Sequence, residues 1–244
     1  MREPLTVAVA QPLCVSHDVQ ANAVAHAAAI RTADAHVVVF PELSMTGYEL
    51  DAEPISLDDP VLAPIVDACA ETGSLALIGA PVETAPGRSH IAMVGVDGAG
   101  ATVRYSKIWL HGTEAERFSP GAEPAVIDVR GWRLGLAICR DTGVAQHAAD
   151  TAALGIDAYV AGVAETADRA EVQDERARAT AIAHAVWVAV ASFAGPTGGG
   201  FDNTAGRSAI WTPKGVAIAR AGREPGDMAR ATLRSAPPGP QPLP

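Results

Sequence analysis

Three short segments carry residue types that could attack, protonate and polarise a substrate. They read VVVFPELSMTGY, VRYSKIWLHGTEAERFSPG and GLAICRD, in this order along the chain, and they offer Glu42, Lys107 and Cys139. Each of the three residues stands at the end of an apolar, strand-like run. A thiolate is a nucleophile, a carboxylate can take the thiol proton and later activate water, and an ammonium group can stabilise an oxyanion. These residue types in this order favour a hydrolase that works through a covalent intermediate.

Taken one at a time, the same residues have ordinary structural explanations. Cys139 would close a buried strand, Glu42 would be an ion-paired carboxylate at a strand end, and Lys107 would be a solvated surface cation. The segment HGTEAERFSPG adds Glu114 and Glu116, and neither glutamate by itself indicates a function. Cys139 lies between a predicted strand and a predicted helix, where free backbone N–H groups could bind an oxyanion, and this position favours a catalytic cysteine. Lys107 would then be the cation that lowers the thiol pKa.

The histidines and glycines of the chain give no comparable signal. The histidine nearest to Cys139 is His147, and no HxxH or HExxH spacing occurs, so we expect neither a metal site nor a cofactor. His111 and His184 are expected to pack, cap or hydrogen bond. The three cysteines form no CxxC pair, which makes a zinc site or a disulfide scaffold improbable. The run GPTGGGFDN lacks the order of a phosphate-binding loop and predicts a flexible loop instead.

Charge and hydropathy restrict the partners of the protein. The chain of 244 residues has a formal net charge of −10 and no Lys/Arg-rich stretch, so a nucleic acid is not expected as a partner. Its apolar runs fall short of the roughly 20 residues that a membrane-spanning helix needs. The first residues run directly into a strand pattern without the features of a signal peptide. We therefore expect a cytoplasmic protein that does not enter a membrane.

Strand and helix patterns alternate along the chain, which predicts an α/β protein. The continuous β-branched run HVVVF is typical of a strand buried on both faces. HIAMVGVDGAGATVRYSK predicts a hairpin, because DGAG supplies turn residues between two alternating runs. We expect one domain over residues 1–234 and a Pro-rich, disordered tail over 235–244. Helices are predicted at 18–35, 61–72, 143–154 and 171–185. Further strands are predicted at 5–11, 36–40, 74–83, 125–129, 133–139, 157–162, 186–193, 206–212, 215–222 and 228–233.

Together, the segments FPELSMTGY, YSKIWLHGTEAERFSPG and GLAICRD resemble the nitrilase superfamily of carbon–nitrogen hydrolases. The similarity runs from AVAQP near the start to GRSAIWTPKGVAIA near the end. It implies a four-layer αββα sandwich in which a glutamate, a lysine and a cysteine meet at one end of the sheets. Carried over by motif, Glu42 is the general base, Lys107 stabilises the oxyanion and Cys139 is the nucleophile. The resemblance also implies a homodimer or a larger homo-oligomer.

The resemblance implies a further catalytic glutamate four residues before the phenylalanine of the FSPG run. Phe118 in FSPG selects Glu114, with Glu116 as the weaker candidate. Two more residues could form the pocket. Tyr48 either lines it or packs at a strand-to-loop corner, and Arg140 either binds a substrate carboxylate or forms an ion pair with the neighbouring Asp141, the second reading being slightly favoured.

The residues after the cysteine distinguish branches of the superfamily. Here Arg140 and Asp141 follow, which is similar to amide-cleaving members and unlike nitrile-cleaving ones. The resemblance therefore implies an amidohydrolase that acts on a small linear carboxamide through a cysteine thioester and releases ammonia and a carboxylic acid. N-carbamoyl amide or nitrile hydrolysis, an acyltransferase, a histidine-dependent cysteine hydrolase and an inactive scaffold remain as alternatives. The run TGVAQHAAD after Asp141 departs from the family, which usually continues with an aromatic-Pro-Glu segment.

Overall fold

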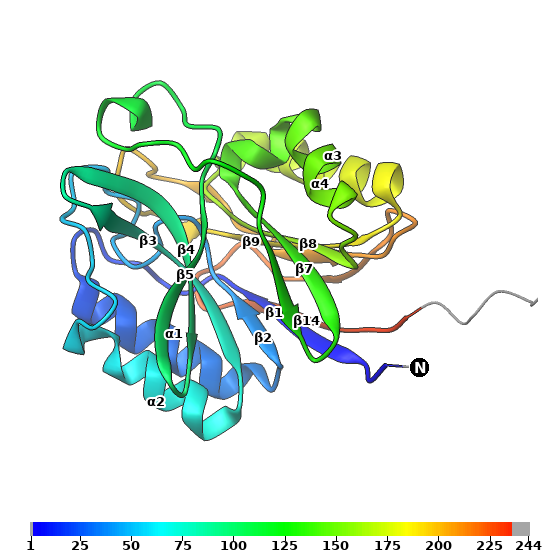
Figure 1. Ribbon diagram of the computed structural model, residues 1–244, viewed down its shortest axis with the longest axis horizontal. Coiled ribbons are helices and arrows are strands. Elements are labelled where there is room, and N and C mark those ends of the chain that lie inside the picture. The colour runs from blue at the N-terminus through cyan, green and yellow to red at the C-terminus, as the bar shows by residue number, and fades with distance from the viewer. Residues whose placement is uncertain (1, 236–244) are drawn as a thin grey trace, which may run out of the picture.

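Two six-stranded sheets pack face to face, and a pair of helices covers the outer face of each (Figure 1). The computed structural model describes residues 2–235. The first sheet has the order β14-β1-β2-β3-β4-β5 and carries α1 and α2, while the second has the order β13-β12-β9-β8-β7-β6 and carries α3 and α4. The four-layer αββα sandwich predicted from the resemblance is confirmed. Nearly all of the predicted tail, 235–244, lies outside the described residues.

The bounds of the elements follow the predicted pattern to within a few residues. The helices are α1 (Val19–Ala33), α2 (Ala63–Thr72), α3 (Ala145–Ala153) and α4 (Ala170–His184), with short 3-10 helices at Pro60–Leu62, Glu114–Glu116, Cys139–Gly143 and Ala167–Arg169. The strands of the first sheet are β1 (Leu5–Ala10), β2 (Val37–Val39), β3 (Leu75–Ala85), β4 (Arg88–Asp97), β5 (Gly100–Ser106) and β14 (Met228–Leu233). Those of the second are β6 (Val126–Val129), β7 (Trp132–Ile138), β8 (Ala158–Val163), β9 (Trp187–Ser192), β12 (Ala209–Trp211) and β13 (Ala217–Arg220).

Two features differ from the predicted elements. The helix predicted at 143–154 begins only at Ala145, because residues 139–143 form a separate 3-10 turn directly after β7. A two-stranded sheet of β10 (Ala194–Gly195) and β11 (Thr204–Ala205), which the sequence pattern did not predict, flanks the run GPTGGGFDN, for which a loop was expected. In the part of the chain that the structure describes, no helix has both the length and the apolar character needed to cross a membrane.

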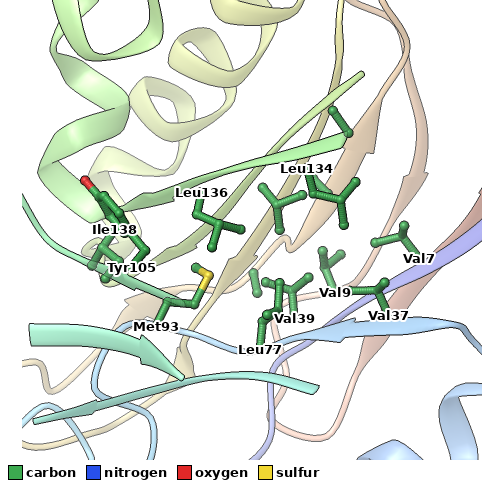
Figure 2. Packing of buried hydrophobic residues seen from close by; sticks show 14 of the residues in the cluster. Val7, Val9, Val37, Val39, Leu77, Met93, Tyr105, Leu134, Leu136 and Ile138 are labelled. Carbon is green, nitrogen blue, oxygen red and sulfur yellow. The ribbon is translucent and has the colours of Figure 1, made fainter. Parts of the chain in front are cut away.

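The alternation of side chains along β2 explains why its sequence is apolar throughout. Val37 and Val39 point into the core between the two sheets, whereas Val38 points into the core between the first sheet and its helices. Successive residues of a strand face opposite sides, so a strand covered on both faces needs apolar residues at every position. Figure 2 shows the inter-sheet core, where Val9 and Leu77 of the first sheet lie opposite Leu134 and Leu136 of the second.

Strand direction brings the reactive segments to one edge of the sandwich. β1, β2 and β3 are parallel, and so are β7, β8 and β9. β5 runs in the direction of β3, because each is antiparallel to β4. The chain leaves β2 just before Glu42, β5 just before Lys107, and β7 just before Cys139. Carboxyl ends of strands are a common place for ligand sites in α/β proteins.

Candidate active site

Two glycines let the backbone that carries Glu42 pass close to both sheets. A Cβ added to Gly79 of β3 would lie 2.3 Å from the carbonyl oxygen of Pro41, and one added to Gly162 of β8 would lie 2.5 Å from that of Phe40. Both distances are far shorter than a carbon–oxygen contact can be. Glycine is therefore required at both positions for the turn after β2 to be clamped between the sheets, and this clamp fixes the position of the Glu42 carboxylate.

Lys107 lies between two buried carboxylates. Its ammonium group donates hydrogen bonds to Glu42 Oε1 at 2.6 Å and to both oxygens of Glu114 at 2.7 Å. The Lys107 and Glu42 side chains are fully shielded from solvent, and that of Glu114 is 1% exposed. Glu114 also accepts hydrogen bonds from the backbone N–H of His111 at 2.7 Å and from the Tyr48 hydroxyl at 3.0 Å. Such buried charges are tolerated only because they are paired and hydrogen bonded.

The two carboxylates have opposite pKa shifts. Burial raises the pKa of Glu42 to about 7, and the charge of Lys107 offsets only part of this increase. Burial acts in the same direction on Glu114, but the charge of Lys107 and the hydrogen bonds that Glu114 accepts outweigh it and lower its pKa. Burial alone would lower the pKa of Lys107, whereas the surrounding negative charges raise it above its ordinary value. The lysine therefore stays charged at neutral pH, and Glu42 can gain or lose a proton there.

Cys139 begins the 3-10 turn after β7 with a left-handed backbone, φ 44°. Its thiol donates a hydrogen bond to the carbonyl oxygen of Ala164 at 3.3 Å, just past the end of β8. Burial raises the pKa of the thiol and the negative charge of Glu42 raises it further, while Lys107 lowers it by less. Lys107 therefore acts on the thiol pKa in the expected direction, but burial and Glu42 outweigh it and the net shift is upward. The thiol stays protonated at neutral pH and needs a base before it can attack.

A free carboxylate oxygen of Glu42 is available to act as the base for the Cys139 thiol. Within residues 2–235, Glu42 Oε2 is buried and has no hydrogen-bond partner, whereas Oε1 is held by Lys107. An unpartnered buried carboxylate oxygen is costly unless it serves a function. Taken with the pKa of about 7, this oxygen can accept a proton from a thiol or from a water molecule.

Asp141 is a structural carboxylate rather than a partner of Arg140. It accepts hydrogen bonds from the Tyr105 hydroxyl at 2.7 Å and from the backbone N–H groups of Ile138 and Trp109, both at 2.9 Å. The favoured ion pair between Arg140 and Asp141 is therefore wrong, because the carboxylate turns inward, where buried backbone donors need an acceptor. Asp141 thereby ties the start of the cysteine turn to the loop that follows Lys107.

His147 belongs to the same buried network. Its Nε2 lies 2.9 Å from the Tyr105 hydroxyl oxygen, and its Nδ1 lies 2.8 Å from that of Tyr159. Because Tyr105 donates its proton to Asp141, Nε2 must be the donor to Tyr105, and Tyr159 must donate to Nδ1. Both ring nitrogens are thus occupied. Burial lowers the pKa of His147, and the neutral ring braces the cysteine turn through Tyr105 and Asp141.

His184 lies at the opposite end of the sandwich. It is the last residue of α4, and the chain then enters β9 at Trp187, which pairs with the first residue of β8. Cys139 lies beyond the other end of these parallel strands, roughly 20 Å away at 3.3 Å per residue. Neither His147 nor His184 is therefore placed to act as the base for Cys139, whereas His111 lines the cavity that contains the thiol.

A cavity of about 410 Å³ opens above the thiol. Tyr48 forms part of its wall, and its ring meets that of Phe201 edge-on with centroids 4.7 Å apart. Arg140 also lines the cavity, whereas Glu116 is exposed and does not, so the structure brings Glu114 rather than Glu116 to Lys107. Among the lining residues that were not anticipated, three are charged, namely Glu165, Arg169 and Arg176. The polar run ETADR directly after a predicted strand was the signal that could have found the first two.

Comparisons with known proteins show the family of the chain and agree with its fold. The model of the carbon-nitrogen hydrolase family matches residues 6–236. A hydrolase from the pqqF 5′ region of Pseudomonas protegens is 28% identical over 91% of this chain and 79% of its own length. A hydrolase of Mycobacterium tuberculosis is 31% identical over 80% of this chain and 76% of its own length. The solved structure of an amidase from Nesterenkonia has a TM-score of 0.84 at 24% identity, covering 94% of this chain and 93% of that one.

Proposed function

The chain belongs to the carbon–nitrogen hydrolase family of the nitrilase superfamily, and from this premise we propose that it is an amidase that cleaves a small linear carboxamide through a thioester on Cys139. The observation that carries the proposal is the arrangement around Lys107, whose charge is held between Glu42 and Glu114 next to a thiol that needs a base. A scaffold protein would have no reason to keep such a costly buried cluster.

The proposed reaction begins with proton transfer from the Cys139 thiol to Glu42. The thiolate attacks the amide carbonyl carbon, and Lys107 and the backbone N–H of Arg140 stabilise the oxyanion that forms. Glu42 then returns the proton to the leaving nitrogen, ammonia departs, and the acyl group remains on sulfur as a thioester. Water, deprotonated by the same carboxylate, attacks the thioester and releases the carboxylic acid. A base with a pKa of about 7 suits these transfers in both directions.

Two relatives support an amide as the substrate. A protein of Pseudomonas sp. that is 28% identical over 131 residues, about half of either chain, is an (R)-stereoselective amidase. In a mutant of the Nesterenkonia amidase, the acetamide moiety of fluoroacetamide is added covalently to the active-site cysteine. Both observations belong to those proteins. They support the choice of small amides as the first compounds to test.

The experiment that tests the proposal is intact-mass spectrometry after acid quenching, with ammonia release followed in parallel. Wild-type protein, Cys139→Ala and Lys107→Ala are mixed with a panel of small amides, carbamoyl compounds and nitriles. We expect an acyl adduct and ammonia from the wild type, no adduct from Cys139→Ala, and turnover lowered about 10²–10³-fold by the loss of the oxyanion donor in Lys107→Ala. Thermal unfolding of each variant serves as the folding control.

Other outcomes would replace the proposal with a defined alternative. Near-normal turnover by Lys107→Ala would remove Lys107 from the mechanism. Turnover of carbamoyl compounds or nitriles in place of amides would change the substrate class, and diversion of the acyl group by added hydroxylamine at the expense of hydrolysis would indicate an acyltransferase. A Cys139 thiol that reacts no faster than an ordinary thiol, with no product from any compound, would indicate an inactive scaffold.

A further inference from the structure

The rim of the cavity above Cys139 is cationic in a protein that is strongly acidic overall. Arg140, Arg169 and Arg176 line this cavity together with a single rim carboxylate, that of Glu165. The rim thus carries an excess of two positive charges, although the chain as a whole has a formal net charge of −10. The positive charge of Lys107 at the floor does not add to this excess, because Glu114 neutralises it.

We infer that the substrate is anionic: a short carboxamide that carries a carboxylate at its other end, which Arg140, Arg169 and Arg176 bind. This inference rests on the proposed amidase function and adds the class of substrate. A cavity of about 410 Å³ is of the size that encloses a small molecule. Guanidinium groups are the side chains best suited to hold a carboxylate, since their N–H groups match its two oxygens.

Glu165 holds two of the guanidinium groups at the cavity. Its Oε1 lies 3.0 Å from Arg169 Nε, and its Oε2 lies 3.4 Å from Arg176 NH1. Glu165 directly follows Ala164, whose carbonyl oxygen accepts the hydrogen bond of the Cys139 thiol. The two arginines are therefore anchored one residue away from a group that touches the nucleophile. Each guanidinium has five N–H donors, so these contacts leave most of them available to a second anion.

Gly143 brings Arg176 against the turn that carries the nucleophile. A Cβ added to Gly143 would lie 2.9 Å from the Cζ of Arg176 and 3.0 Å from its Nε. The guanidinium group therefore lies directly on the Cys139–Gly143 turn, where any larger residue would push it away. This close contact places one cation beside the turn that carries the thiol, where both line the same cavity.

Arg140 is the cation whose charge is not offset by a contact. Among residues 2–235 its side chain forms no hydrogen bond and no ion pair, because the neighbouring Asp141 is engaged by Tyr105, Ile138 and Trp109. An unpaired guanidinium next to the nucleophile is an available donor for a substrate carboxylate. It also strengthens the positive potential that draws an anion into the cavity.

The first arm of the test compares amides that differ only in charge. Succinamate carries a carboxylate where levulinamide carries a neutral methyl ketone, and malonamate and glutaramate vary the length. We expect the wild type to prefer succinamate, and Arg140→Gln and Arg176→Gln each to lower kcat/KM for the favoured anionic amide by about tenfold or more, as for a lost hydrogen bond to a charged group. The loss of kcat/KM should be smaller for levulinamide than for the anionic amide, because its neutral ketone forms no ion pair with a guanidinium group. Arg178→Gln is the control, since Arg178 lies on the same helix but does not line the cavity.

The second arm measures the cationic rim without any turnover. Iodoacetate and iodoacetamide alkylate the same thiol and differ in charge, and Cys14 and Cys69 are buried. The alkylation rate of Cys139 is followed by intact mass for both reagents. We expect the ratio of the iodoacetate rate to the iodoacetamide rate to exceed that of a free cysteine, to fall in Arg140→Gln and Arg176→Gln, and to stay unchanged in Arg178→Gln.

The two arms separate failure of this inference from failure of the proposed function. Equal kcat/KM for succinamate and levulinamide, together with an ordinary alkylation ratio, would overturn the anionic substrate and leave the amidase in place. Turnover of no amide, together with a raised ratio that the arginine variants abolish, would overturn the amidase and retain an anion-binding rim. A raised ratio that survives both arginine substitutions would assign the effect to other charges and overturn the inference.

Discussion

Replacing Glu114 with glutamine tests whether the fourth charged residue of the site acts through Lys107. The Glu114 carboxylate accepts four hydrogen bonds, two on each oxygen: Lys107 and the Tyr48 hydroxyl on Oε1, and Lys107 and the His111 N–H on Oε2. A glutamine has one oxygen and one NH2 group in this place. Whichever way the amide is turned, its NH2 group faces two donors, so no orientation can satisfy the site.

The size of the effect follows from burial and charge. Breaking a buried ion pair on one side typically costs about 3–5 kcal/mol, and the remaining pair with Glu42 places the expected loss of stability at the lower end of this range. Lys107 would also shift toward Glu42, and a displacement of about 1 Å in an active site can lower the rate about 10²-fold. The negative charge of Glu114 is one of the causes that raise the pKa of Glu42. Its removal should therefore lower that pKa and move the acidic limb of the pH–rate profile to lower pH.

The assay is kcat/KM as a function of pH for the wild type, Glu114→Gln and Glu116→Gln, with urea unfolding of each. Glu116 lies in the same 3-10 turn but is exposed, so its variant should behave as the wild type does. A rate that falls while the acidic limb stays in place would mean that Glu114 has only a structural role. Equal behaviour of the two variants would refute the reasoning altogether.

Three further predictions concern Glu42 and its backbone. We expect kcat/KM to rise as Glu42 loses its proton at about pH 7 and to show no fall near the ordinary thiol pKa of about 8.5; a profile flat through neutral pH would contradict this. Because the pKa of folded Glu42 is raised, its contribution to stability should be complete below its unfolded value of 4.5 and be lost as pH rises through about 7, a dependence that urea unfolding of Glu42→Gln should lack. Gly162→Ala should lower the free energy of unfolding by about 1–3 kcal/mol and reduce kcat, because its Cβ would displace the clamped backbone. Gly112→Ala, whose Cβ meets open space, is the stability control.

Much of the fold could be predicted because strand burial leaves a clear mark on the sequence. The β-branched run of β2 and the turn residues DGAG between β4 and β5 were both interpreted correctly. The start of α3 was misplaced, because a 3-10 turn and an α-helix share the same local preferences, and the extended backbone of Val144 that separates them leaves no mark on the sequence. The pair β10 and β11 has two residues per strand, which is too short for any periodicity to show.

The site could be predicted only in part, because the sequence shows which residue types are present but not the direction in which each side chain points. The segments around Glu42, Lys107 and Cys139 predicted one cluster, and the direction of their strands brings them to the same end of the sandwich. The neighbouring charges of Arg140 and Asp141 suggested a pair, but adjacent side chains in a tight turn point apart. The sequence likewise contains no indication that Arg176, more than thirty residues after Cys139, returns to the same turn; the contact exists because α4 packs beside it.

The opposite behaviour of the two carboxylates explains how one lysine can organise the whole reaction. Glu114 accepts four hydrogen bonds and stays ionised, so it keeps a full negative charge beside Lys107 and holds the ammonium group in place. Among the residues that the structure describes, Glu42 accepts one hydrogen bond and keeps a second oxygen free, so burial raises its pKa to the range in which a proton can be taken and returned. Two glutamates with equal environments would either both hold the lysine or both titrate. The asymmetry in their hydrogen bonds separates the roles, since only the less satisfied carboxylate can move a proton at neutral pH.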